Sequence, residues 1–210
     1  MTYDIQESFE KSRIAGSIAA GALDEVAKIV KPGISTNEID KICYEFINDH
    51  SAYSAPLFYR GFPKSCCTSA NHVVCHGIPS DKVLKEGDII NVDVTAYKEG
   101  WHGDTSRMFK IGEISIKAKK LIAITYESMM KAIKIVKEGI QLGDIGSVIQ
   151  NYVEASYPRS QRKLLLLLVL GVFGLPSSSM LYHPDQRKQS CRPIYLILQQ
   201  ANGMHKVFDT

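Results

Sequence analysis

The sequence predicts a mixed α/β fold of the α+β kind, with helices packed against a small antiparallel sheet. Two observations support this prediction. Two stretches with apolar residues at helical spacing come first, and a long segment that alternates polar and apolar residues and folds back on itself follows them. Helical spacing then returns in two further stretches, so the strands lie between two pairs of helices.

The helices are predicted from their spacing and their end signals. Apolar side chains recur every three or four residues from Ile14 to Val30, and Pro32-Gly33 ends that helix. Ser35-Thr36-Asn37-Glu38 has the form of a capping box, which predicts a second helix through about His50. The same spacing predicts two later helices, over residues 116–137 and 143–155.

The strands are predicted from alternation and turn residues. Short strands are expected at residues 65–69 and 73–76, after a loop at 56–61. Residues 87–110 are typical of a β-hairpin, with its turn at Lys98-Glu99-Gly100.

Length and composition describe an ordinary globular chain of 210 residues, with 45% hydrophobic and 22% charged residues. These values exclude disorder, collagen and coiled coil as descriptions of the whole. The net charge of only +3 argues against a dominant nucleic-acid role. Five cysteines without CxxC pairs favour reduced thiols in the cytosol, and the first residues do not have the pattern of a signal peptide.

The composition changes abruptly near Ala155. Residues 156–210 carry seven basic and two acidic side chains, contain no glutamate, and include the apolar run Leu164–Leu175. That run is too short to span a bilayer, which takes about 20 residues, so buried core or an aggregation-prone segment is the better interpretation. We therefore expect one domain over 1–155 and a divergent, basic, leucine-rich tail over 156–210, with a frameshift, a fusion or a divergent end as its origin.

A short internal repeat connects the two pairs of helices. The segment Val30–Ile34 and the segment Val136–Ile140 share a pattern at an offset of 106 residues, and each precedes a predicted helix. The match is either chance or the sign of a duplicated helix–helix–sheet unit.

Two aspartates in the hairpin are the strongest chemical signal. Asp93 and Asp104 are eleven residues apart and flank the turn, so a tight hairpin would set them opposite each other, with Cβ atoms roughly 5 Å apart. Two facing carboxylates repel each other unless a divalent cation lies between them. Taken alone, the pair is either a cation site or two solvated aspartates on an open strand face.

The surrounding motifs resemble those of type I methionine aminopeptidases. The resemblance is carried by four segments and covers about residues 5–155; the segments are Tyr59–Ser65, Asn71–Pro79, Asn91–Val94 and Gly100–Arg107. It implies the pseudo-symmetric pita-bread fold, with the first half intact and the second half incomplete.

The resemblance also implies a metal site. Asp93 and Asp104 match the first two ligand positions for two divalent metal ions (Co, Mn, Fe or Zn), and Asp104 is expected to bridge them. His76 matches the catalytic histidine that contacts the substrate backbone near the scissile bond; the alternative is an ordinary turn residue before Gly77. His72 and His102 are interpreted as surface or supporting residues.

Three further residues match the wall of the pocket for the methionine side chain: Tyr59, Phe62 and Cys67. Aromatic faces and a thiol suit a polarizable thioether. The alternative is that these residues are ordinary core. The adjacent pair Cys66-Cys67 is interpreted as two reduced thiols.

The implied activity is metal-dependent removal of the initiator methionine from nascent peptide N-termini at the ribosome, by a cytoplasmic monomer with no nucleic-acid partner and no membrane span. The family continues with a Gly-His-Gly-Ile-Gly strand and two glutamate ligands, whereas this chain has Leu164–Leu168 at that place and no glutamate after Glu154. His183 and His205 do not have the family's surroundings. Impaired activity is therefore expected, and the alternatives are a catalytically dead binding module or a frameshifted, non-functional product.

Overall fold

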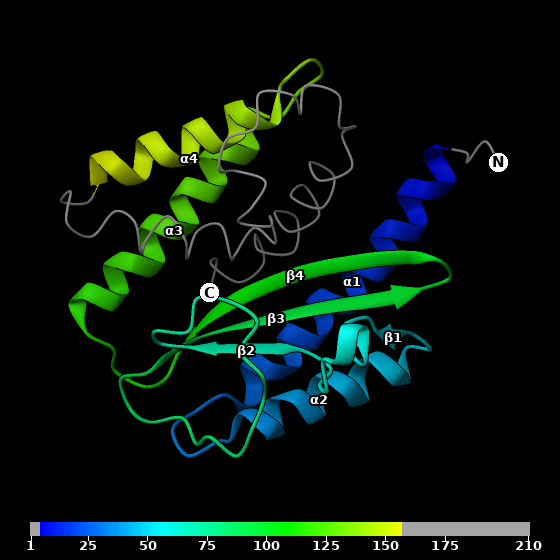
Figure 1. Ribbon diagram of the computed structural model, residues 1–210, viewed down its shortest axis with the longest axis vertical. Coiled ribbons are helices and arrows are strands. Elements are labelled where there is room, and N and C mark those ends of the chain that lie inside the picture. Colours follow the sequence, from blue (N-terminus) through cyan, green and yellow to red (C-terminus); the bar gives the residue numbers. More distant parts are fainter. Residues whose placement is uncertain (1–4, 157–210) are drawn as a thin grey trace. The chain divides into compact units, whose positions relative to one another are not determined.

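The computed structural model describes residues 5–156, which divide into two compact units, 5–114 and 115–156 (Figure 1). The mixed helix-and-sheet class expected from the sequence is confirmed. The expectations for the apolar run Leu164–Leu175 and for the two late histidines fall outside the described residues. The division into a domain over 1–155 and a tail over 156–210 remains a prediction.

Two helices form one layer of the first unit. Helix α1 (Ile5–Ile29) buries small and apolar residues at helical spacing, from Ala15 to Val26, and ends before Gly33, whose φ is +97°. Helix α2 (Thr36–Asp49) begins with the predicted capping box. The Ser35 hydroxyl accepts a hydrogen bond from the Glu38 N–H, and the Glu38 carboxylate accepts one from the Ser35 N–H.

The second layer is a four-stranded antiparallel sheet of β1 (Tyr53–Ser54), β2 (Cys67–Ala70), β3 (Ile89–Lys98) and β4 (Trp101–Lys110). Strand β4 pairs with β3 along its whole length, so β1 and β2 share the other edge of β3. Helices α1 and α2 cover one face of this sheet (Figure 1). That face supplies the buried core positions of β3: Ile90, Val92, Val94 and Ala96.

Two details of the strand predictions are wrong. Residues 73–76 do not form a strand, and the two-residue strand β1 had no signal in the sequence. The hairpin turn is tighter than predicted, because Lys98 pairs with Trp101 and only Glu99 and Gly100 connect the strands. Both have positive φ (+49° and +91°), as a type I′ turn requires.

The second unit is a helical hairpin of α3 (Ile116–Lys134) and α4 (Leu142–Ser156), whose buried residues include Met129 and Ile149. None of the helices in the described part of the chain has the length and apolar character needed to cross a membrane.

The geometry of the helix connections supports the internal repeat. Helices α2 and α4 begin 106 residues apart, and Gly33 and Gly139 both have positive φ. Ile34 donates to the Lys31 carbonyl at 3.3 Å, and Ile140 donates to that of Lys137 at the same distance. The Gln141 N–H donates to the Asp144 carboxylate, as Ser35 does to Glu38. A shared turn chemistry of this kind favours duplication over chance.

Candidate metal centre and substrate pocket

Asp93 and Asp104 lie on neighbouring antiparallel strands and on the same face of the sheet. Asp93 pairs with Ser106 and Asp104 pairs with Thr95. The two aspartates are therefore diagonal neighbours, whereas the sequence suggested that they lie directly opposite each other. The tighter turn shifts the pairing by two residues. Because side chains alternate with a period of two, that shift keeps both aspartates on one face.

The two carboxyl groups interact directly. Each carboxyl group lies close enough to the other to shift its pKa. Burial, followed by repulsion from Asp104, raises the pKa of Asp93 well above its ordinary value. Burial also raises the pKa of Asp104, although hydrogen bonds from Thr95 and Asp93 and the nearby His102 and His76 oppose that rise. The expected juxtaposition of the two aspartates is thus present.

The strand that carries Asp104 is seated directly on helix α1. Gly103 has no room for a side chain, because a Cβ there would lie 2.1 Å from the Ala15 carbonyl carbon and the Gly16 nitrogen. Four residues further along β4, Arg107 forms an ion pair with Asp24 of α1 at 2.9 Å. These two contacts flank Asp104 and fix the strand on both sides of it.

Cys67 lies beside the carboxylates, directly across β2 and β3 from Asp93. It is buried, and burial followed by repulsion from Asp93 and Asp104 raises its pKa to about 12. The thiol therefore stays protonated at neutral pH. All four cysteines in the described part of the chain are free, as the sequence predicts.

The loop with the other two expected pocket residues starts and ends on β3, within two residues of Asp93. Ala55 donates to the Thr95 carbonyl at 2.9 Å, and the chain returns to β3 where Cys67 pairs with Asp93. The loop between them contains Phe62, which is half-buried, and Tyr59, which is 64% exposed. Its connections to the sheet bring this loop to the aspartate pair, and the pocket wall itself remains a prediction.

His76 is exposed and has a left-handed backbone (φ +55°). The next residue, Gly77, accepts a hydrogen bond from the Thr68 N–H at 2.8 Å, and a Cβ on it would lie 2.2 Å from the Thr68 carbonyl oxygen. Close contact with β2 thus explains why glycine follows His76. The nearby His76 lowers the pKa of Asp104, which agrees with a position beside the aspartates, but its catalytic role is still a prediction. His72 and His102 are exposed.

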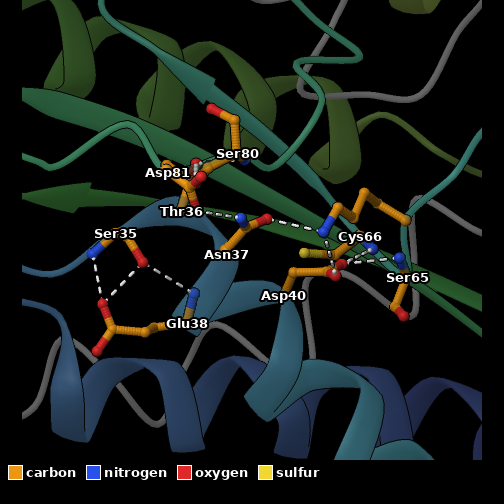
Figure 2. Close-up of polar contacts among 10 residues, drawn as sticks. Ser35, Thr36, Asn37, Glu38, Asp40, Ser65, Cys66, Ser80 and Asp81 are labelled. Atoms are coloured by element: carbon orange, nitrogen blue, oxygen red, sulfur yellow. Dashed lines mark hydrogen bonds and ion pairs between the residues drawn. The ribbon is translucent and has the colours of Figure 1, made fainter.

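The first turn of α2 anchors the chain before Cys67 and after His76 (Figure 2). Asp40 accepts hydrogen bonds from the Ser65 and Cys66 N–H groups at 2.7 and 3.1 Å. Asn37 accepts one from Lys64 and donates one to Asp81, both at 2.7 Å. This cluster joins the two segments that carry the expected substrate contacts.

Sequence reasoning missed several residues that position the site: Thr95, Gly103 and Asp40. The Thr95–Asp104 pair was readable in principle, because a two-residue Glu99-Gly100 turn fixes the register of the whole hairpin. The close contact at Gly103 and the hydrogen bonds of Asp40 had no local signal, since their partners lie more than 20 residues away.

The donor chemistry of the aspartate pair suits a hard divalent cation. Two ionised carboxylates on a partly buried sheet face repel each other, and a cation between them removes that repulsion. The set is incomplete, however: no group of three or more histidine, cysteine, aspartate or glutamate side chains within residues 5–156 is arranged to hold a metal ion. Asp93 and Asp104 therefore fit part of a metal centre.

Comparison with known families identifies the class of protein as a metallopeptidase. Residues 10–178, more than half of the chain, match metallopeptidase family M24, and the chain belongs to that family.

Within the family, the chain resembles methionine aminopeptidases. It is 55% identical over 149 residues to the methionine aminopeptidase of Rickettsia prowazekii (strain Madrid E), covering 71% of this chain and 58% of that protein. For the enzyme of Escherichia coli (strain K12), the identity is 53% over 151 residues, covering 71% of this chain and 57% of that protein.

The fold comparison agrees with the sequence comparison. The crystal structure of the Rickettsia prowazekii enzyme matches with a TM-score of 0.71 and 53% identity, over 74% of this chain and 62% of that one. This match confirms the pita-bread fold that the motifs implied. The chain spans less than two thirds of the length of these relatives.

Proposed function

We propose that this chain carries the first metal-ligand pair and the side-chain pocket of a methionine aminopeptidase, which removes the initiator methionine from nascent proteins. The observation that carries the proposal is the pair Asp93 and Asp104, which are diagonal neighbours on one face of the β3–β4 hairpin. The identity of 53–55% to named methionine aminopeptidases supports it.

In this proposal Asp93 and Asp104 would hold two divalent ions of the Co, Mn, Fe or Zn kind. When bound, such ions polarise a peptide carbonyl and lower the pKa of a water molecule. His76 holds the substrate backbone at the scissile bond and stabilises charge that develops there. Its exposure and its position next to Gly77, which is fixed against β2, support this role.

The same proposal assigns the methionine side chain to a pocket walled by Tyr59, Phe62 and Cys67. Cys67 supports it most directly, because it is buried across from Asp93 and its pKa keeps it a neutral, polarizable thiol. The substrate is then a nascent peptide N-terminus at the ribosome, in the cytoplasm, and the protein acts as a monomer without nucleic acid.

We further propose that the chain as written is a weak enzyme. The described residues provide two carboxylate ligands and no group of three, and residues 157–210 contain no glutamate. Substituting a residue that only supports a metal ligand typically lowers metal affinity or activity by about 10–100-fold. The absence of ligands themselves should lower it further. The same observations support the second candidate, a binding module of the same fold that has lost catalysis, or a frameshifted product.

The test combines metal binding with turnover of Met-Ala-Ser. We expect Mn²⁺ to bind measurably by titration calorimetry, Asp93→Asn to abolish that binding, and Asp49→Asn, a change at an exposed carboxylate of α2, to leave it unchanged. Turnover with saturating Mn²⁺ or Co²⁺ is expected far below the typical enzyme value of about 10 s⁻¹. Turnover within about tenfold of that value, abolished by Asp93→Asn, would refute the proposed weakness. Absence of any Mn²⁺ binding by the unsubstituted chain would refute the metal site and favour the second candidate.

A further inference from the structure

We propose that Thr95 is a positioning residue for the aspartate pair: its hydroxyl holds one carboxylate oxygen of Asp104 and so sets the direction in which that carboxylate meets a cation. The inference rests on the proposed metal site and adds to it a residue that determines its affinity.

The contact is direct and is built into the hairpin register. The Thr95 hydroxyl donates to Oδ1 of Asp104 at 2.8 Å, and the two residues are paired across β3 and β4. Threonine is branched at Cβ, which restricts its χ1 rotation and keeps the hydroxyl in place. With Oδ1 held, the plane of the carboxylate is fixed, and the direction of Oδ2 with it.

Strand β3 has a neighbour on each of its edges at Thr95. Strand β4 pairs with it on one side, and on the other side the Ala55 N–H donates to the Thr95 carbonyl at 2.9 Å. The second contact also ties the start of the expected pocket loop to this residue. Thr95 therefore links the loop to the carboxylate pair.

Asp104 is fixed from the opposite layer. Gly103 contacts the α1 backbone at Ala15 and Gly16 with no space for a Cβ, and Arg107 pairs with Asp24. Both ends of the Thr95–Asp104 hydrogen bond thus belong to rigid elements.

Orientation matters here because the two carboxylates repel each other. Without a cation, an ionised carboxylate that is free to rotate turns away from an ionised neighbour, and a cation must then reorient it. A hydrogen bond that already holds the binding orientation removes that cost. Partners of metal ligands typically contribute 10–100-fold in metal affinity.

The experiment measures the affinity for Mn²⁺ alone by titration calorimetry, with the stability of each variant followed by urea denaturation. Thr95→Val removes the hydroxyl at constant shape, and Thr95→Ser restores it. Thr68→Val is the matched control: the same chemical change on β2, at a buried hydroxyl that lacks a hydrogen-bond partner among the described residues. If Thr95→Val does not fold, Thr95→Ala takes its place.

We expect the hydroxyl-free variant to bind Mn²⁺ at least about tenfold more weakly, Thr95→Ser to remain within about threefold of the unsubstituted chain, and Thr68→Val to bind normally. Equal affinity in Thr95→Val and the unsubstituted chain would overturn the inference while leaving the metal site intact. So would a Thr95→Ser variant as weak as Thr95→Val. An unsubstituted chain that binds no Mn²⁺ would overturn the proposed function, and this inference with it.

Discussion

The contact between strand β4 and helix α1 makes Gly103→Ala a sharp test of the packing. A Cβ at this position would lie 2.1 Å from the Ala15 carbonyl carbon and the Gly16 nitrogen, and 2.4 Å from the Ala15 oxygen. Ordinary contact begins at 3.4 Å, so strand and helix must separate by about 1.3 Å. All three atoms are backbone, so no side-chain rotation relieves the overlap.

The expected cost follows from overpacking. Extra methylenes in a packed core typically cost about 1–3 kcal/mol, and a backbone overlap belongs at or above the upper end, so we expect a loss of about 3 kcal/mol. Domains of this kind are stable by only about 5–15 kcal/mol, so the loss is a large share of the total. The separation also moves Asp104, the next residue, away from Thr95.

The assay is urea denaturation followed by fluorescence of Trp101, the only tryptophan of the chain, which opens β4 two residues before Gly103. Gly21→Ala is the control on the same helix, because its Cβ would lie 2.7 Å from the end of the Phe46 ring, a side chain that is able to turn away. We expect the control to stay within about 1 kcal/mol of the unsubstituted chain. A Gly103→Ala chain as stable as the Gly21→Ala chain would refute the close seating of β4 on α1.

Three other outcomes follow from the described contacts. Asp40→Ala leaves two buried N–H groups without their acceptor and should lower the free energy of unfolding by about 2–3 kcal/mol. Asp40→Asn keeps an acceptor, so its loss should be smaller. Equal losses for the two variants in urea denaturation would contradict this. Hydrogen bonds from the Ser35 N–H and then its hydroxyl lower the pKa of Glu38 below 4.5, so its contribution to stability is present above about pH 4.5 and is lost as the pH falls through the lowered value. In acid titrations monitored by circular dichroism, Glu38→Gln should therefore lose less helix signal as the pH falls than the unsubstituted chain does. An equal loss of helix signal in both chains would count against the capping box. Cys67, with its pKa of about 12 and its buried side chain, should react with N-ethylmaleimide at pH 7.5 far more slowly than the exposed Cys75; peptide mapping that finds equal rates would disprove its burial.

Local patterns in the sequence were sufficient for most of the secondary structure. The capping box at Ser35 and Glu38 was predicted and is present, because all of its hydrogen bonds join residues within one turn. The hairpin and the shared face of Asp93 and Asp104 were also predicted, since alternation along a strand has a period of two. The motif around these aspartates led to the correct family. Strand β1 was missed because two residues are too few to form a pattern.

The surroundings of the aspartate pair were decided by the tertiary structure. The sequence by itself determined that two carboxylates share one face of the hairpin, and its two-residue turn places them diagonally and pairs Asp104 with Thr95. That Cys67 lies across from Asp93, and that Gly103 lies against α1, depends on which strand pairs with β3 and on how closely a helix approaches the sheet. Such contacts join residues tens of positions apart, and they form because the whole core packs at once, which no local pattern of residues encodes.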